Sequence, residues 1–281
     1  LGTANPVRGA TPPPPPTPTP TERLISEVQG AGAASPLEGD LVTVTGVVTA
    51  SFQETLDGFF LQEEDTDSDG DAATSEGIFI FAPGATTVEE GYTVTVTGTV
   101  AEFFDETQIE ADTLTIDSVD TAAGLAAVTP AIVDLPVGPG LDRDAFYEPF
   151  EGMLVEFADT LTVTQLFNYE RFGEIHLSEG GRVYQYTQTN APDVAGNAAY
   201  QDEQLARRIV LDDGSNEQNP DTIPFLNVPE FGGGDTIDDL TGVVRYSFGD
   251  FKVAPTEANP ITVTNANPRE ATPEDVGGDR K

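Results

Sequence analysis

The sequence predicts an all-β protein made of two similar domains, and three observations support this. Its apolar segments favour Val, Ile, Thr and Phe, which pack well on pleated strands. Its 28 Gly and 22 Pro interrupt those segments at short intervals, as turns do in all-β proteins. A similar order of elements also returns after roughly a hundred residues, which indicates an internal repeat.

The composition indicates a folded and strongly acidic chain. Its 281 residues are 38% hydrophobic and include 16 Phe, which is enough apolar material for two cores. The formal net charge is −37, and no Lys or Arg occurs between Leu24 and Asp142. Because nucleic-acid binding depends on cations that neutralise phosphates, we expect the first half to repel nucleic acid. The second half holds most of the basic residues, which keeps nucleic acid open as its partner.

Cysteine usage and the N-terminus bear on localisation. The chain has no Cys, so neither a disulfide nor a thiolate metal site can form. No apolar run is long enough to span a bilayer, and the chain begins at Leu1 without a signal peptide. We interpret Leu1 as a processed mature N-terminus and expect a secreted protein, extracellular or at the cell surface.

Residues 1–22 are predicted to form a Pro/Thr-rich extended arm or linker. Residues 11–20 contain only Thr and Pro, which favours polyproline II over a strand ladder. Such an arm is a spacer by default. The alternative is that it contacts a neighbouring copy of the chain and supports a homo-oligomer or filament.

Residues 23–121 are predicted to form a first barrel from five strands. The strand candidates are residues 41–52, 58–62, 77–81, 92–100 and 107–116. The first and fourth contain an internal glycine, Gly46 and Gly98, where a strand can bend around a barrel corner. Five short strands with glycine bends are typical of a small closed Greek-key barrel of the OB type.

Residues 65–76, between the second and third strands, match a calcium-binding loop. The pattern places carboxylates at loop positions 1, 3, 5 and 7, a glycine at 6 and a glutamate at 12, and its predicted ligands are Asp65, Asp67, Asp69, Asp71 and Glu76. The flanking segments are predicted strands rather than the helices of an EF-hand, so we predict a Ca²⁺-clamped β-hairpin. A solvated acidic turn is the alternative interpretation.

Residues 122–264 are predicted to form a second OB-like barrel, followed by a C-terminal linker at 265–281. An insertion at 181–205 separates its second strand from its third, at 207–211, and occupies the place of the calcium loop. A second metal site is one interpretation of the oxygen donors that cluster after the third strand, at Asp212, Asp213, Ser215 and Asn219. A simple Asp-Gly turn explains the same residues.

Five segments together resemble a known family. They are LISEVQG at 24–30, SPLEG at 35–39, GFFLQEED at 58–65, TSEGIF at 74–79 and RIVLDDG at 208–214. Their order resembles the OB-like region that precedes the catalytic domain in bacterial extracellular nucleases of the endonuclease/exonuclease/phosphatase superfamily. The resemblance implies that a metal-dependent nuclease domain would follow these barrels in a full-length protein.

No catalytic residue of that family can be assigned in this chain. Its nuclease domains use histidines beside metal-binding carboxylates, whereas this chain has one histidine, His176, in a predicted strand. A lone histidine without a convergent partner is poor evidence for general-base catalysis. We therefore predict no enzymatic activity for this chain.

The sequence thus supports three functional hypotheses. The first is a secreted, non-catalytic, calcium-binding tandem OB module that is an accessory region of, or is derived from, an extracellular nuclease. The second is a self-assembling filament or surface-layer subunit that uses residues 1–22 for contacts. The third is single-stranded nucleic-acid binding by the second barrel, where aromatic residues such as Tyr246, Phe248 and Phe251 could stack on bases.

Overall fold

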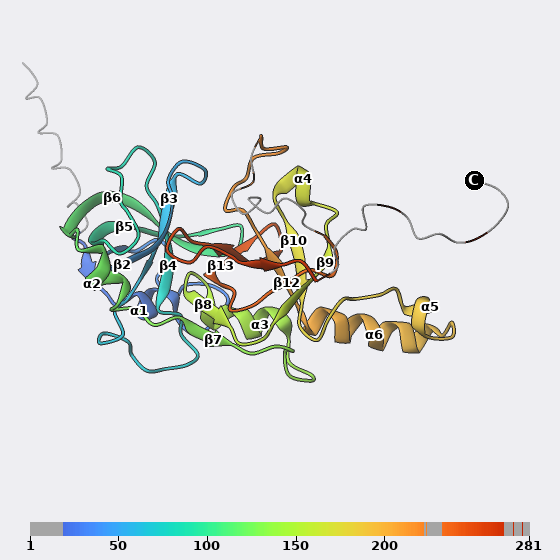
Figure 1. Ribbon diagram of the computed structural model, residues 1–281. Helices are drawn as coiled ribbons and strands as arrows, with labels where there is room; N and C mark the ends of the chain where they lie inside the picture. The colour runs from blue at the N-terminus through green and yellow to red at the C-terminus, as the bar shows by residue number, and fades with distance from the viewer. Residues whose placement is uncertain (1–18, 222, 224–231, 267–271, 273–276, 278–281) are drawn as a thin grey trace, which may run out of the picture.

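The computed structural model describes residues 19–221, 223, 232–266, 272 and 277, and these form mostly β-sheet. Two barrels lie side by side along the molecule (Figure 1). This confirms the predicted fold class, an all-β chain with two tandem OB-like barrels. Residues 1–18 of the predicted arm and most of the predicted C-terminal linker lie outside the described residues.

The first barrel contains five strands. They are β2 (Leu41–Phe52), β3 (Gly58–Gln62), β4 (Gly77–Phe81), β5 (Thr93–Phe103) and β6 (Glu106–Ser118). Their order is β2-β3-β4-β6-β5, and β5 pairs with β2 to close the barrel. The pair β4–β6 is parallel and the other pairs are antiparallel. This order is that of a five-stranded Greek-key OB barrel.

A glycine allows β2 to serve both sides of this barrel. The strand pairs with β5 through residues 41–47 and with β3 through residues 47–52. At Gly46, next to this change of partner, an added Cβ would lie 2.5 Å from the Gln62 carbonyl oxygen. Only glycine fits such a close approach of two backbones, and β2 pairs on both sides as predicted.

The second barrel repeats this order with a divided first strand. Its strands are β8 (Leu154–Phe157), β9 (Leu161–Gln165), β10 (Ile175–Ser178), β11 (Arg208–Leu211), β13 (Thr241–Ser247) and β14 (Asp250–Pro255). They follow the order β9-β10-β11-β14-β13-β8, with β11–β14 parallel. Because β8 and β9 are consecutive in sequence, they together take the place that β2 has in the first barrel.

Short elements extend both sheets and connect them. The additional strands are β1 (Thr21–Glu22), β7 (Ala131–Val133), β12 (Thr236–Ile237) and β15 (Val263–Thr264). The helices are α1 (Ile25–Gln29), α2 (Thr121–Leu125), α3 (Arg143–Tyr147), the 3₁₀-helix η1 (Glu148–Phe150), α4 (Tyr169–Phe172), α5 (Tyr186–Thr189) and α6 (Val194–Ala206). The end of the predicted arm is thus a strand, since β1 pairs in parallel with β2.

The insertion between β10 and β11 is helical, which the sequence pattern did not predict. Helix α6 has 13 residues, and the Asp193 side chain caps it by accepting a hydrogen bond from the Gly196 N–H. Gln204 is its only buried residue. Without an apolar face to bury, the helix has no clear 3.6-residue periodicity in the sequence. In Figure 1 it extends away from the strands of the second barrel.

Each barrel has its own apolar core, and a third apolar cluster joins them. The first barrel contributes Ala50, Leu56, Phe60 and Phe79 to this junction, and the second contributes Leu154, Val243 and Ala254. The backbones also meet closely, because a Cβ on Gly77 would lie 2.3 Å from the Gly152 carbonyl oxygen. The two barrels therefore share a packed junction.

Candidate functional site

The predicted calcium loop is the connection between two paired strands. β3 and β4 pair antiparallel, so strands flank the loop as the sequence predicts. At its base the Glu63 N–H donates to the Glu76 carbonyl oxygen at 3.0 Å, which extends the hairpin into the loop. The hairpin half of the prediction is therefore confirmed, whereas the bound ion stays a prediction.

Two carboxylates lie buried at the base of this loop. One Glu76 oxygen accepts hydrogen bonds from Ser68 Oγ at 2.7 Å and from the Asp69 N–H at 3.1 Å. Its other oxygen, Oε2, is buried and accepts no hydrogen bond from an N–H or hydroxyl group, and the residue is 8% exposed. Glu63 is buried beside it and accepts from the Ile25 N–H at 2.6 Å. Burial and then the Glu76 carboxylate raise the pKa of Glu63 to about 8.

The other predicted calcium ligands are spread along the loop. Asp65 accepts from the N–H and the hydroxyl of Thr129, at 2.9 and 2.6 Å. Asp69 accepts from the Asp71 N–H at 2.7 Å, which lowers the pKa of Asp69, and Asp71 accepts from the Ala73 N–H. Asp67 is exposed. Within the described part of the chain, no three Asp, Glu or His side chains converge closely enough to hold a metal ion.

The donor set nevertheless fits a hard cation in its chemistry. Every predicted ligand offers carboxylate oxygen, which Ca²⁺ prefers, and the glutamate at position 12 lies at the base of the loop. A cation beside Glu76 would supply the partner that its buried oxygen lacks. Binding would require the aspartates to move towards that glutamate.

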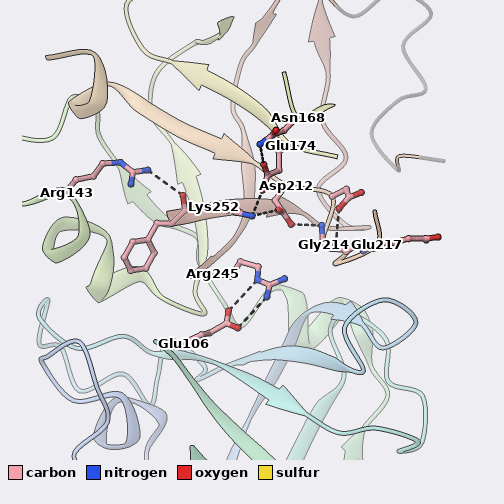
Figure 2. A network of polar contacts seen from close by, with 12 residues as sticks. Glu106, Arg143, Asn168, Glu174, Asp212, Gly214, Glu217, Arg245 and Lys252 are labelled. Atoms are coloured by element: carbon pink, nitrogen blue, oxygen red, sulfur yellow. Dashed lines mark hydrogen bonds and ion pairs between the residues drawn. The ribbon is translucent and has the colours of Figure 1, made fainter. Parts of the chain in front are cut away.

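The predicted second metal site contains a lysine of the protein. Asp212 is buried and accepts from Lys252 Nζ at 3.2 Å and from the Gly214 N–H at 2.9 Å (Figure 2). Asp213 accepts from the Ser215 N–H, and burial followed by the Asp212 charge raises its pKa to about 7. Asn219 instead uses its backbone N–H to bond the Arg171 carbonyl oxygen. The aspartates are adjacent, but the ammonium group already neutralises one of them.

Lys252 is the centre of a buried network that the sequence analysis missed. Its ammonium also donates to Glu174 Oε1 at 2.5 Å, and Glu174 Oε2 accepts from Asn168 Nδ2 at 2.6 Å (Figure 2). Burial alone would lower the pKa of Lys252, but Asp212 and Glu174 outweigh it and raise the pKa. The available signal was a lysine within the otherwise apolar strand segment 251–254.

A second charged group surrounds the single histidine. Asp250 accepts from Arg143 and forms an ion pair with Arg208 at 3.3 Å. His176 lies in β10, as predicted, and pairs with Val210 of β11. Burial and then the Arg208 charge lower the pKa of His176 to about 4, so its imidazole is neutral at neutral pH.

Each barrel exposes a phenylalanine at the tip of the hairpin between its fourth and fifth strands. Phe104 lies between β5 and β6 and Phe248 between β13 and β14, with φ of 52° and 53°. Their exposed fractions are 78% and 82%. Phe248 differs from Phe104 in having a cation beside it, since Lys252 Nζ lies 5.2 Å from its ring centroid. Phe251, another aromatic residue considered for base stacking, belongs to the second core.

The strand order of the two halves defines a tandem OB-fold protein. Residues 129–266, which include the second barrel, match the model of a family described as "Domain of unknown function (DUF8508)". No curated protein has a sequence that matches this chain. Among solved structures, the crystal structure of fission yeast Pot1 and ssDNA aligns with a TM-score of 0.27 and 10% identity, over 80% of this chain and 83% of that chain. The barrel assignment rests on the strand order.

No helix within the described residues is both long enough and apolar enough to cross a bilayer.

Proposed function

We propose that this chain is a non-catalytic tandem OB module that calcium stabilises through the loop at residues 65–76. One observation carries the proposal: Glu76, the glutamate at position 12 of the loop pattern, is buried with an oxygen that accepts no hydrogen bond from an N–H or hydroxyl group. Glu63 adds a second buried carboxylate next to it. Two adjacent buried carboxylates are costly to ionise unless a cation or a proton compensates them.

Calcium would then act on stability and on the shape of the loop. A ligand that binds the folded chain and not the unfolded chain stabilises it by mass action, by about 2.7 kcal/mol at a hundred times its dissociation constant. The loop adjoins the junction, since Ser75 Oγ donates to the Glu151 carbonyl oxygen at 2.5 Å. Calcium at roughly millimolar concentration outside cells is enough to load a weak site of this kind.

Thermal unfolding with and without calcium tests this proposal. We expect the midpoint of the wild-type chain to rise by about 5–10 °C between EGTA and millimolar Ca²⁺. D67N should remove most of this rise without harming the calcium-free fold, because Asp67 is exposed at loop position 3. D112N removes the same charge from an exposed position on β6 and should keep the full rise. Equal midpoints in EGTA and Ca²⁺ for the wild-type chain would refute calcium binding.

We further propose that the module is secreted and accompanies an extracellular nuclease. The support is the resemblance of its ordered segments to the OB-like region of those enzymes. Intact-mass analysis of the native protein from culture medium tests it. A longer secreted polypeptide with a nuclease domain supports this assignment, and a native protein found only inside cells contradicts it.

A second candidate function is single-stranded nucleic-acid binding by the second barrel. The favouring observation is Phe248, which is 82% exposed on the loop between the fourth and fifth strands, a loop that OB folds use for ligands. Fluorescence anisotropy with single-stranded DNA tests it. Binding should weaken steeply with salt and should fall in F248A but not in F104A, which alters the equivalent hairpin of the first barrel. Binding that is insensitive to salt would exclude phosphate recognition.

A further inference from the structure

Carboxylates from both barrels meet around one threonine at the junction. The Thr107 N–H donates to Glu151 Oε1 at 2.9 Å, and the Thr107 hydroxyl donates to Glu102 Oε1 at 2.9 Å. Thr107 and Glu102 belong to the β5–β6 hairpin of the first barrel, whereas Glu151 precedes β8 of the second. Two acidic side chains of different barrels are therefore held beside each other.

These carboxylates are buried and incompletely bonded. Glu151 is 2% exposed, and its Oε2 has no hydrogen-bond partner. Glu102 Oε2 is likewise buried without a partner. A buried acceptor that lacks a donor costs about 1–3 kcal/mol, and more when it carries a charge. The arrangement is therefore unfavourable if both groups are ionised.

The charges around Glu151 do not neutralise it. The groups that act on it are Glu102 on β5, Glu106 on β6 and Glu148 on η1, all of them acidic. Arg245 on β13 pairs with Glu106, with 3.5 Å between Arg245 Nε and Glu106 Oε1 (Figure 2). More distant charges act on the neighbours rather than on Glu151 itself, namely Asp212 and Lys252 on Glu106 and Asp144 on Glu148.

A proton satisfies this cluster better than a metal ion does. Arg245 pairs with the Glu106 carboxylate. A proton on Glu151 would remove a buried charge and turn its free oxygen into a donor. A metal would need several carboxylates around a single point, and no three such groups converge within the described residues. Burial and then the Glu106 charge raise the pKa of Glu151 well above its usual value, and burial followed by Glu102 raises that of Glu148 to about 7.

We propose that the barrel junction is a proton-binding site, in which protonation of Glu151 couples the packing of the two barrels to pH. The unfolded chain releases this proton near pH 4.5, whereas the folded chain retains it to higher pH. The folded state therefore binds more protons in that window, and its stability falls as pH rises. Mildly acidic conditions tighten the junction, and alkaline conditions loosen it.

Thermal unfolding between pH 5.5 and 8.5 tests the proposal with E151Q. Glutamine keeps the acceptor for Thr107, adds N–H donors and removes the charge. We expect E151Q to raise the midpoint at pH 8.5 by about 3 °C or more and to change it little at pH 5.5. E110Q, which removes an exposed glutamate from β6, should shift the midpoint by a similar small amount at both pH values.

Two controls keep this test independent of the calcium loop. The series is run in EGTA, and calcium stoichiometry is measured by equilibrium dialysis for D67N with and without E151Q. Loss of a bound calcium on adding E151Q would show a metal site and overturn the proton site. An equal decrease of the E151Q midpoint at both pH values would also overturn it. Hydrogen exchange of the Thr107 amide provides a local readout. After correction for the intrinsic pH dependence of exchange, its rate should rise with pH more in the wild-type chain than in E151Q.

Discussion

The two barrels share one topology but stabilise it differently. In the first barrel a single 12-residue strand, β2, closes the sheet, and polar contact along its outer face comes from threonine pairs such as Thr43 with Thr97 at 2.8 Å. In the second barrel the two short strands β8 and β9 take the place of β2. The outer face of this barrel carries buried ion pairs around Lys252 and Asp250. The strand order is therefore compatible with either neutral or charged packing.

The difference follows the distribution of cations along the chain. Strands β2 to β6 contain no Lys or Arg, so their carboxylates have only hydroxyl groups, N–H groups or the second barrel as partners. Arg245 reaches across from the second barrel to Glu106 of the first. The second barrel thus supplies its own counter-charges and one for its neighbour. Removing a cation should consequently cost more than removing a hydroxyl pair.

Replacing Lys252 should have the largest effect. K252M leaves Asp212 and Glu174 buried without their counter-charge, and breaking a buried ion pair in this way costs about 3–5 kcal/mol of unfolding free energy. Urea unfolding at neutral pH measures the loss. The triple variant K252M/D212N/E174Q removes all three charges and should recover most of it. A loss below about 1 kcal/mol in K252M would mean that the network contributes little.

Substitution at the contact between the barrels should rank second. In G77A the new methyl group meets the Gly152 backbone, so the barrels must separate locally, and overpacking of this kind costs about 1–3 kcal/mol. Urea unfolding again measures the effect. G32A is the matched control, because nothing lies within 4 Å of the added Cβ there, and it should change stability by less than about 0.5 kcal/mol. Equal effects of G77A and G32A would argue against a tight junction.

The sequence predicted the features that local patterns encode. Gly46 marked the part of β2 where the strand changes partner, because the close approach of the Gln62 carbonyl oxygen leaves no room for a side chain there. The acidic loop was placed correctly between two strands because its flanks, GFFLQ and GIFIF, are short segments rich in Phe, Ile and Leu. In these cases the information lies within about ten residues, which is the reach of periodicity and turn chemistry.

The features that were missed depend on contacts distant in sequence. Lys252 lies 40 residues from Asp212 and 78 from Glu174, so no spacing rule could join them. Asp212 was therefore assigned to a metal site when its bonded cation is a lysine. The junction glutamates were missed for the same reason, since 44 residues separate Thr107 from Glu151. Helix α6 was missed because it buries almost nothing.

His176 should also make stability depend on pH, but the effect should be smaller than that of Glu151 at the junction and opposite in sign. The unfolded chain takes up a proton on this histidine below about pH 6.5, whereas the folded chain does so only near pH 4. Stability is therefore lost as pH falls through this window, by about 1 kcal/mol at pH 5 for a half-buried group. NMR can follow it directly, because the chain has one histidine. An imidazole titration midpoint near 6.5 would contradict the buried, neutral state, and H176Q should abolish the loss.

The threonine pairs of the first barrel should show the smallest effect. A double-mutant cycle with T43V and T97V should give a coupling of about 0.2–1 kcal/mol, as expected for cross-strand pairs. The same cycle at Thr45 and Thr95, whose hydroxyl oxygens lie 2.9 Å apart, is the matched comparison and should give a similar value. Because valine also favours strands, each single variant should remain folded. A coupling as large as the loss in K252M would mean that hydroxyl pairs hold the first barrel as strongly as ion pairs hold the second, and the contrast between the barrels would fail.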